Sequence, residues 1–394
     1  MTVASSYVAD VTLFDGRRVQ AHRGVLVEGE RIAWVGAHAR APREAVRARA
    51  VDGAGATLTP GLIDCHVHLS MDGTADFASE AAALNEARAV AKATANLRRH
   101  LSAGITSVRD LGGPAIAELS RCVAERIVPG PNLVSAGRAL TITGGHGHNV
   151  GFAREVDGAD AVRRAVREEI RSGARAIKVV ATGGVLTPRI GSTFTAFTPE
   201  ELAAAVGEGH AWGCGVAAHA IGAEGILQAV EAGVDSVEHC VQATAAVVRA
   251  MKARGTFRSA TLVALLGIAG NPDEVPAYAA EKAQALVADA REGHARSVRA
   301  GVRQVVGTDA GTPFNPHGNA PRELVTMVEW GTRPLDAMVA ATANGAELLG
   351  LPDVGTVEPG KLADLCLYDA NPVEDPRAVL APRRVWKAGR LWRG

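Results

Sequence analysis

The two ends of the chain carry the alternation of apolar and polar residues that is typical of partly exposed β-strands. Residues 8–36 alternate in short runs, which Asp15-Gly16 and Gly29-Glu30 interrupt as hairpin turns would. Near the other end, the stretches LADLCLYDA and RRVWKAGRLWRG are also strand-like. We therefore expect a small sheet at the start of the chain, which the terminal strands can join to form one sheet across both termini.

Between these ends, apolar runs alternate with alanine-rich stretches of helical composition. The runs include GITSVRD, AIKVVATGG, GVAAHAIG, VDSVEHC and RQVVGTDAG. Parallel strands need crossovers, usually helical, and eight such units close a barrel whose catalytic residues lie at the carboxyl ends of the strands. The pattern predicts an α/β fold, a (β/α)8 TIM-like barrel. The less regular segment SATLVALLGIAGNPDEVPAY, which follows Arg258, predicts a loop and a helix over the barrel mouth.

Composition and charge narrow the class of protein. The chain has 394 residues, of which 47% are hydrophobic and 21% charged, as expected of a globular protein with a large core. Its 42 basic and 42 acidic residues cancel, which argues against a nucleic-acid partner. No signal peptide is evident, and no run approaches the roughly 18 apolar residues of a membrane span. We expect a cytoplasmic protein without a membrane partner. Its five scattered cysteines form no CxxC pair, which argues against disulfides and a cysteine zinc site.

The strongest chemical motif is TPGLIDCHVHLS, in which His66 and His68 end an apolar strand. Residues i and i+2 of a strand share a face, so both imidazoles point the same way, as a shared metal ion requires. The alternative is a pair of histidines on a solvated strand face.

Four further residues end successive apolar runs. Lys178 lies within RAIKVVATGG, where a bare buried ammonium would be costly. Carbon dioxide could convert it to an anionic carbamate that bridges two metals, whereas the alternative is a snorkelling or ion-paired lysine. His219 in GVAAHAIG, His239 in VDSVEHC and Asp309 in VVGTDAG follow, and each alone could be an ordinary structural residue.

Taken in this order, the HxH pair, lysine, two histidines and aspartate closely resemble the ligand set of the metal-dependent amidohydrolase superfamily. The resemblance spans nearly the whole chain and implies a composite β-sandwich built from residues 1–57 and 353–394 around a barrel of residues 58–352. It also implies one metal on His66, His68 and Asp309, another on His219 and His239, and N6-carboxylated Lys178 bridging both. Zinc is the expected metal, with manganese, iron and cobalt as alternatives. Relatives often form homo-oligomers, and we expect one here.

Longer blocks resemble one branch of the superfamily, that of imidazolonepropionase-like proteins and bacterial Xaa-Pro-type dipeptidases. These blocks are TITGGHGHNVG, KVVATGGVLTP, HAIGAEGI, SVEHC and GTDAGTPFNPHGNAPREL. The resemblance implies that His146 approaches the substrate carbonyl, with His148 beside it. The alternative is a glycine-rich loop with two exposed histidines.

The chemistry of such a site can be stated concretely. Two metal ions about 3.5–4 Å apart would acidify a bridging water and supply hydroxide at neutral pH. Asp309 would accept the proton of that water and carry it to the leaving nitrogen. A metal ion and His146 would polarise the scissile carbonyl. Glu238, next to His239, could orient a ligand, although strand alternation predicts that its side chain points the other way.

The sequence also departs from the dipeptidase pattern. Ile221 stands where such enzymes are expected to carry a tyrosine that binds the carbonyl oxygen, and Phe197 stands where related sequences often have another tyrosine. An apolar pocket is therefore expected. Arg189, Arg154 and His317 are candidates for binding a substrate carboxylate, although each could equally be a solvated or structural side chain.

We expect an amide hydrolase acting on a small molecule: a dipeptide, an N-acyl amino acid or a related aromatic amide, ochratoxin-like amides included. The alternative keeps the site and changes the reaction, to opening of a cyclic amide or imidazolone-type ring, deamination or carbamate cleavage. Deaminases of the superfamily usually lack the lysine bridge, so Lys178 favours the two-metal class. A non-enzymatic scaffold would not need six metal-binding groups. A Rossmann enzyme is excluded because no GxGxxG follows the first strand.

Overall fold

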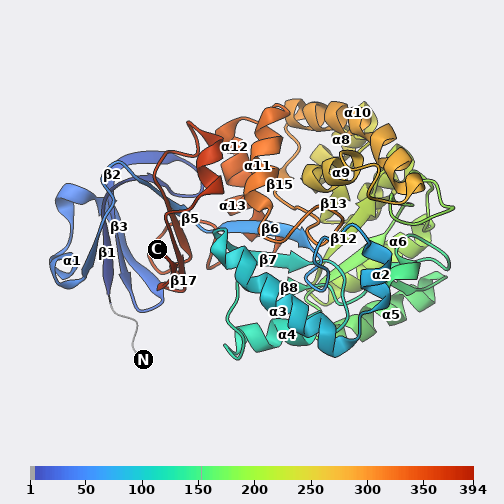
Figure 1. The fold of residues 1–394 in the computed structure, drawn as a ribbon, viewed down its shortest axis with the longest axis horizontal. Coiled ribbons are helices and arrows are strands. Elements are labelled where there is room, and N and C mark those ends of the chain that lie inside the picture. The colour runs from blue at the N-terminus through green and yellow to red at the C-terminus, as the bar shows by residue number, and fades with distance from the viewer. Residues whose placement is uncertain (1–4, 152) are drawn as a thin grey trace.

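Strands from both ends of the chain form a single eight-stranded sheet in the computed structural model, which describes residues 5–151 and 153–394 (Figure 1). The strands run in the order β18-β17-β16-β5-β1-β2-β3, and β4 pairs with β1. Their bounds are β1 (Ser6–Phe14), β2 (Val19–Glu28), β3 (Arg31–Ala37), β4 (Arg49–Asp52), β5 (Thr57–Pro60), β16 (Leu365–Tyr368), β17 (Arg384–Lys387) and β18 (Arg390–Arg393). The predicted hairpins are confirmed, and the antiparallel pairing of β5 with β16 joins the two termini in one sheet.

The core of this sheet draws on both termini. Leu13, Ile32 and Leu58 from the first part of the chain pack with Leu367 and Trp386 from the last part. A short 3-10 helix, η1 (His38–Arg40), and α1 (Arg43–Arg47) connect β3 to β4. Because neither terminal segment can bury its apolar face alone, the two ends of the chain are held together by hydrophobic burial.

Parallel strands form the central part of the molecule in two sheets. The first has the order β6-β7-β8, and the second has the order β10-β9-β11-β12-β13-β14-β15. Every residue of β6, β7 and β11 is buried, as expected of parallel strands that are covered on both faces. The bounds are β6 (Leu62–Val67), β7 (Ile105–Asp110), β8 (Asn132–Ser135), β9 (Ala139–Thr141), β10 (Ala153–Glu155), β11 (Ala176–Val180), β12 (Gly215–Ala220), β13 (Ser236–His239), β14 (Phe257–Ser259) and β15 (Gln304–Val305).

Backbone hydrogen bonds connect these two sheets at both edges of the smaller one. On one side, the Arg175 amide donates to the Ser135 carbonyl at 2.8 Å, which ties β8 to the start of β11. On the other side, the Cys65 amide donates to the Val306 carbonyl at 2.8 Å, and the Asp309 amide donates to the His66 carbonyl at 2.7 Å. The carboxyl end of β6 therefore lies directly beside the segment that follows β15.

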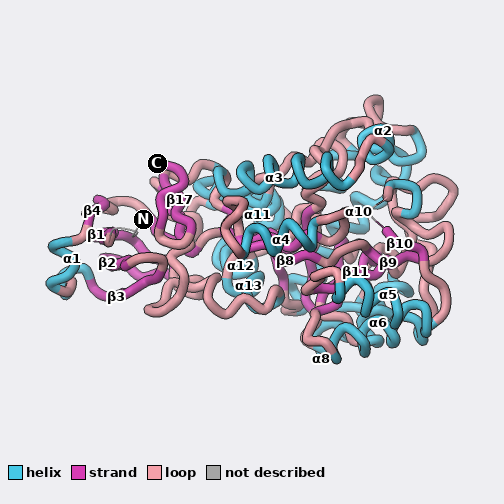
Figure 2. The backbone as a smooth tube through the Cα atoms, turned by 90° about the horizontal axis from the view of Figure 1, so that it is seen from below, coloured by secondary structure: helices cyan, strands magenta, loops and turns pink. Residues whose placement is uncertain are grey.

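Helices cover the outside of the parallel strands (Figures 1 and 2). Their amphipathic patterns explain this placement: in α5, Val162, Ala165 and Val166 are buried while the arginines of the same helix are mostly exposed. The α-helices are α2 (Phe77–Ala82), α3 (Glu86–Ser102), α4 (Ile116–Ala124), α5 (Ala159–Arg171), α6 (Pro199–Ala211), α7 (Ala223–Ala232), α8 (Ala245–Arg254), α9 (Leu262–Ala269), α10 (Ala277–Ala300), α11 (Ala320–Glu329), α12 (Pro334–Ala340) and α13 (Ala343–Leu348), and the 3-10 helices are η2 (His148–Val150) and η3 (Pro376–Leu380).

The sequence prediction of alternating strands and helices is confirmed for the central part of the chain, since each of β11 to β14 is followed by at least one helix. The predicted helix after Arg258 is also present, as α9. Within the described residues, no helix combines the length and the apolar composition that crossing a membrane requires.

Candidate metal centre and active site

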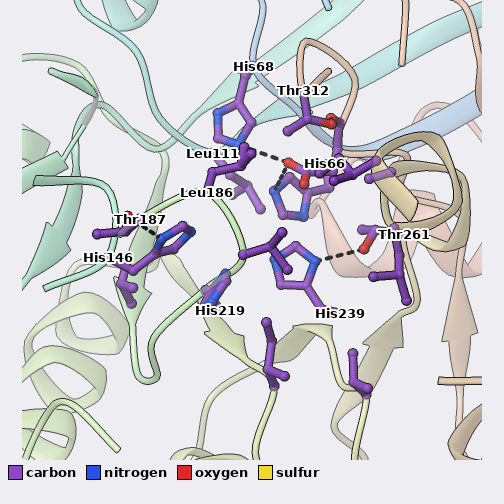
Figure 3. A pocket seen from close by; sticks show the side chains of 18 of the residues that line it. His66, His68, Leu111, His146, Leu186, Thr187, His219, His239, Thr261 and Thr312 are labelled. Atoms are coloured by element: carbon purple, nitrogen blue, oxygen red, sulfur yellow. Dashed lines mark hydrogen bonds and ion pairs between the residues drawn. The ribbon is translucent and has the colours of Figure 1, made fainter. Parts of the chain in front are cut away.

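Six polar side chains predicted from the sequence lie around one pocket at the carboxyl ends of the parallel strands. His66 belongs to β6, Lys178 to β11, His219 to β12 and His239 to β13. His68 follows β6 directly, and Asp309 lies in the segment after β15. We call these six residues the polar floor of the pocket. Figure 3 shows that the imidazoles of His66 and His68, from the end of β6, converge on a common space with those of His219 from β12 and His239 from β13. Strand ends that meet at one rim bring residues together across 243 positions of sequence, from His66 to Asp309.

His66, His68 and Asp309 form the tightest group of potential metal ligands. One Asp309 carboxylate oxygen lies 3.2 Å from His66 Nε2 and 3.1 Å from His68 Nε2. The three ligand atoms lie within 4.8 Å of one another, a spacing that a single metal ion can bridge. Burial alone would raise the pKa of Asp309, but His66 and His68 hold this pKa well below its usual value. Asp309 is therefore deprotonated at neutral pH, the form that a metal ion would bind.

The protein fixes one ring nitrogen of each histidine in the floor. The imidazoles of His66 and His68 donate to a carboxylate and a carbonyl, that of His219 donates to a carbonyl, and that of His239 contacts a hydroxyl. The contacts are His66 Nδ1 to Glu238 Oε2 at 3.0 Å, His68 Nδ1 to Gly112 O at 3.1 Å, His219 Nε2 to Gly183 O at 2.8 Å and His239 Nδ1 to Thr261 Oγ1 at 2.7 Å. Metal-binding histidines commonly have such partners, which fix the tautomer and the ring orientation and make the second nitrogen the metal donor.

The second pair of histidines is also poised as neutral ligands. The ring centroids of His219 and His239 are 4.5 Å apart, and that of His66 is 5.4 Å from that of His239. Burial lowers the pKa of His239 to about 3 and holds the pKa of His219 well below its ordinary value. An imidazole must be neutral to bind a metal, so this environment favours the ligand form of both rings.

The environment of Lys178 shows whether the floor fits two metal ions bridged by a carboxylated lysine. Its side chain is 3% exposed, and its Nζ has no hydrogen-bond partner within the described part of the chain. Burial lowers the pKa of this amine to about 8. Leaving a buried amine without a partner is costly, and the neutral amine is the form that adds carbon dioxide. The environment of Lys178 therefore fits a carboxylated lysine, because His66, His219 and His239 line the same pocket.

Sequence reasoning placed Glu238 on the wrong face of its strand. Glu238 pairs in register with His219, so both side chains lie on the same face of the sheet. Its Oε1 accepts hydrogen bonds from Arg109 at 2.8 Å and Ser236 at 2.6 Å. Burial alone would raise its pKa, but Arg109 and His66 hold the pKa of Glu238 well below its usual range. His239 is the residue that departs from strand alternation, because its φ of 67° turns the backbone at the end of β13.

Backbone conformations that are rare for residues with side chains recur at the floor. His239, Thr261 and Asp309 all have positive φ, at 67°, 49° and 60°. Such conformations cost free energy and persist where surrounding contacts determine them, as happens at functional sites. Here they aim His239 and Asp309 into the pocket and bring the Thr261 hydroxyl to His239.

His146 lies at the edge of the floor, in the loop between β9 and β10. Its Nδ1 lies 2.7 Å from the Thr187 hydroxyl, and its ring centroid lies 4.7 Å from that of His219 (Figure 3). A side chain at Gly184 would put a Cβ 2.4 Å from the His146 ring, so glycine is required for this approach. Burial lowers the pKa of His146 to about 4, which keeps the ring neutral.

Above the floor, the pocket is almost entirely apolar. The cavity has a volume of about 930 Å³, counting its open mouth. We call seven of its aliphatic lining residues the apolar wall: Val185, Leu186, Ile221, Val241, Leu265, Ile268 and Leu286. Two of these residues come from α9, which therefore covers the pocket as the sequence indicates. Phe197, in contrast, is buried in the protein core and does not line the pocket.

Several candidate substrate contacts do not line this pocket. His148 and Arg189 are exposed, and His148 Nδ1 donates to the Gly145 carbonyl at 2.8 Å. His317 is buried elsewhere, with Nε2 donating to the Met71 carbonyl at 2.6 Å. Arg154 forms an ion pair with Glu168 at 2.5 Å. Among the described residues, Lys178 is the only lysine or arginine that lines the cavity.

Comparison with known proteins places this geometry in a family. Residues 57–391 match the amidohydrolase family. The ochratoxinase of Aspergillus niger is 32% identical over 434 aligned positions, covering 100% of this chain and 89% of that protein, and its crystal structure superposes with a TM-score of 0.89. A crystal structure of a Xaa-Pro dipeptidase with bound methionine is 29% identical, covers 99% of this chain and 100% of that one, and has a TM-score of 0.91. The imidazolonepropionase of Salinispora tropica is 29% identical, over 88% of this chain and 85% of that protein. The chain is a hydrolase acting on carbon–nitrogen bonds and belongs to the amidohydrolase family.

Proposed function

We propose that this protein hydrolyses the amide bond of a dipeptide, an N-acyl amino acid or a related aromatic amide with a binuclear metal site. The observation that carries the proposal is the buried Lys178 amine, which has no hydrogen-bond partner among the described residues and lines one pocket with four histidines that each have one ring nitrogen held by the protein. His66, His68 and Asp309 would hold one divalent ion and His219 and His239 the other, with carboxylated Lys178 between them. Zinc is the expected metal, and manganese, iron or cobalt would suit the same ligands.

The metal pair, when bound, supplies a water of lowered pKa and polarises the substrate carbonyl. The residues of the floor prepare this chemistry. Glu238 accepts a hydrogen bond from the Nδ1–H of His66, which leaves Nε2 of that ring as the nitrogen that would bind the metal. Asp309, deprotonated at neutral pH, can accept a proton from the attacking water at its carboxylate and deliver it to the leaving nitrogen.

His146 acts on the other side of the scissile bond. The Thr187 hydroxyl accepts a hydrogen bond from the Gly147 amide at 3.1 Å, so its own proton can be donated to His146 Nδ1. The proton of the neutral His146 ring then lies on Nε2, where it can be donated to the carbonyl oxygen as negative charge develops there.

The apolar wall supports a substrate with a large hydrophobic group. Ile221 and the other aliphatic side chains of the wall offer contact area to an aromatic or long aliphatic acyl group. The candidate carboxylate readers Arg189, Arg154 and His317 lie off the cavity lining, as does His148. The similarity to an ochratoxinase and to a Xaa-Pro dipeptidase supports amide cleavage with such groups.

We also propose the architecture that this chemistry needs. The hydrogen bonds at both edges of β6-β7-β8 support one closed (β/α)8 barrel of residues 58–352, with residues 1–57 and 353–394 as a β-sandwich domain. A homo-oligomeric state and a cytoplasmic location are part of the same proposal, and light scattering of the purified protein would measure the first.

The proposal is tested with protein grown with zinc and bicarbonate and assayed against a pooled set of dipeptides, N-acyl amino acids and N-aroyl amino acids. We expect release of free amine from aromatic or bulky acyl substrates, two metals per chain, and a carbamate signal by ¹³C NMR after loading with ¹³C-bicarbonate. The Lys178→Ala variant should lose all three. A silent pool with two metals bound would contradict the amide assignment and favour the alternative, hydrolysis of a cyclic amide, carbamate or imidazolone-type ring.

A further inference from the structure

The segment of residues 183–191, between β11 and α6, touches both parts of the pocket. Its Gly183 carbonyl holds His219, its Thr187 hydroxyl holds His146, and its Val185 and Leu186 side chains belong to the apolar wall. We call it the pocket loop. Any shift of the pocket loop would therefore move a candidate metal ligand, the histidine that faces the substrate carbonyl, and the contact surface for the substrate together.

The pocket loop contains no helix or strand of its own that would hold its backbone in place. Its Gly183 amide donates to the Phe194 carbonyl at 2.8 Å, but the carbonyls of Gly184, Thr187 and Ile190 point instead toward α10. Arg189 adopts a φ of 67°, which is unfavourable for a residue with a side chain. This conformation needs a compensating contact.

Lys282 of α10 supplies that contact. Its Nζ donates to the carbonyls of Gly184 at 3.3 Å, Thr187 at 2.7 Å and Ile190 at 2.6 Å. An ammonium has three donors and no acceptor, so these three carbonyls match its hydrogen-bonding capacity. The carbonyls of Thr187 and Ile190 lie on either side of Arg189 in sequence, so the ammonium joins the two ends of the turn in which Arg189 has its positive φ. The bonds are charge-assisted, and Lys282 is only half-buried, so its charge costs less than that of a fully buried amine.

One face of α10 continues this contact along the pocket. Tyr278, Lys282 and Leu286 are spaced by four residues and so lie on the same side of the helix. The Tyr278 hydroxyl donates to the Leu186 carbonyl at 3.2 Å, and Leu286 belongs to the apolar wall. The helix therefore binds the backbone of the pocket loop with two polar residues and lines the cavity with the next residue of the same face.

We propose that Lys282 is a positioning residue, which fixes the pocket loop so that Thr187 orients His146 and Val185 and Leu186 form the substrate contact surface. The inference rests on the proposed function, because His146 matters for catalysis only if the substrate carbonyl binds beside it. Lys282 lies outside the cavity lining and acts through the backbone of the loop.

The first test is kinetic and uses the Lys282→Met variant, which retains the apolar stem and removes the charge. We expect kcat to fall about 10-fold to 100-fold, as when the supporting partner of an active-site histidine is lost. Thr187→Val should lower kcat similarly, and the double variant should be little worse than either single one, because both changes act on the same histidine. Multiplicative losses in the double variant would overturn the proposed route through Thr187.

The matched control is Lys252→Met. Lys252 also donates to a backbone carbonyl, that of Ala300 at 2.9 Å, but it is exposed and lies on α8 away from the pocket lining. Its replacement should leave kcat and KM unchanged. If Lys252→Met and Lys282→Met reduce kcat equally, the effect is a general loss of stability and the proposal fails.

The second test is independent of activity. Hydrogen–deuterium exchange should be faster in peptides covering residues 183–191 of Lys282→Met than in the wild type or Lys252→Met, and unchanged exchange in a folded variant would overturn the proposal. If Lys282→Met does not fold, Lys282→Arg replaces it, since a planar guanidinium cannot reach all three carbonyls in the same way. A wild type that hydrolyses no amide would contradict the proposed function, whereas the exchange experiment would still decide whether Lys282 holds the loop.

Discussion

The polar floor and the apolar wall share one cavity but are fixed in different ways. In the floor, each histidine has a defined partner for one ring nitrogen, and the carboxylate of Glu238 links His66 to the buried Arg109. In the wall, aliphatic side chains such as Ile221 and Leu286 are held by packing against each other and against Val241. Hydrogen bonds fix direction, whereas apolar packing fixes volume.

This difference indicates which residues of the pocket can be substituted without loss of function. A metal ligand that is rotated loses its function, because coordination depends on direction. An aliphatic wall residue can be replaced by another of similar size with a modest cost, because the hydrophobic effect is not directional. Catalysis should therefore depend on the floor, and substrate choice should depend on the wall.

Replacing Asp309 should have the largest effect. The Asp309→Asn variant removes the proposed anionic ligand of the first metal and the proposed proton acceptor and donor, so kcat should fall about 100- to 10,000-fold. Elemental analysis should also show less metal per chain. The control is Asp289→Asn, an exposed aspartate that accepts a hydrogen bond from Gln242 at 2.9 Å, which should retain full activity. Full activity of Asp309→Asn would contradict its double role.

Glu238→Gln should have the next largest effect, because it weakens the support of His66 without touching the pocket lining. Metal affinity should fall roughly 10- to 100-fold. The variant also leaves the Arg109 charge buried without its partner, so the free energy of unfolding should fall by roughly 3–5 kcal/mol. Metal titration and urea unfolding measure the two effects.

The control for Glu238→Gln is Glu118→Gln, which disturbs an exposed pair between Glu118 and Arg121 on α4. Exposed pairs contribute little to stability, so neither quantity should change measurably in this variant. If Glu238→Gln behaves like its control, the buried network does not support the floor.

The wall should respond in selectivity and not in metal binding. Leu286→Ala enlarges the cavity and should lower kcat/KM for a bulky aromatic amide about 10-fold, with a smaller change for small acyl groups. Metal content should stay at the wild-type level. Leu391→Ala, at a surface position that is 40% exposed, serves as control. An equal loss for all substrates would show that the wall does not select among acyl groups.

Sequence reasoning reached much of this arrangement because the relevant signals are local. Two histidines separated by one residue must share a strand face, and residues that end successive parallel strands must meet at one rim. The structure places His66, His68, Lys178, His219, His239 and Asp309 around one pocket. The hairpin turns at Gly16 and Gly29 could also be predicted from the sequence, and both glycines have the positive φ that such turns require.

The hydrogen-bond partners that hold these residues in place could not be predicted from the sequence, because they come from distant positions of the chain. Arg109 meets Glu238 across 129 positions, and Lys282 meets Thr187 across 95. Strict strand alternation also misplaced Glu238, since it does not foresee the positive φ of His239. Arg189 and His317 carry suitable charge or hydrogen-bonding groups, but nothing in their local sequence shows that they lie outside the cavity lining.

The smallest effect on activity should come from Glu323, which joins the wall to the rest of the fold. Its fully buried carboxyl accepts hydrogen bonds from the Leu262 and Val263 amides at 2.9 Å, at the start of α9. Burial raises the pKa of Glu323 from 4.5 to about 8 against the effect of these bonds. Between these two pH values the folded protein holds a proton that the unfolded chain releases, so Glu323 makes the folding free energy less favourable as pH rises from 4.5 to 8.

The Glu323→Gln variant isolates this contribution. Glutamine keeps an acceptor oxygen for only one of the two α9 amides, and it cannot lose a proton. The stability of the variant should therefore increase relative to that of the wild type as pH rises from 4.5 to 8. Urea unfolding across this range measures the difference, and metal content serves as the readout for the floor. Because α9 contributes Leu265 and Ile268 to the wall and no residue to the floor, the pH-dependent change should leave metal binding intact. A parallel loss of metal would show that the floor and the wall are not independent.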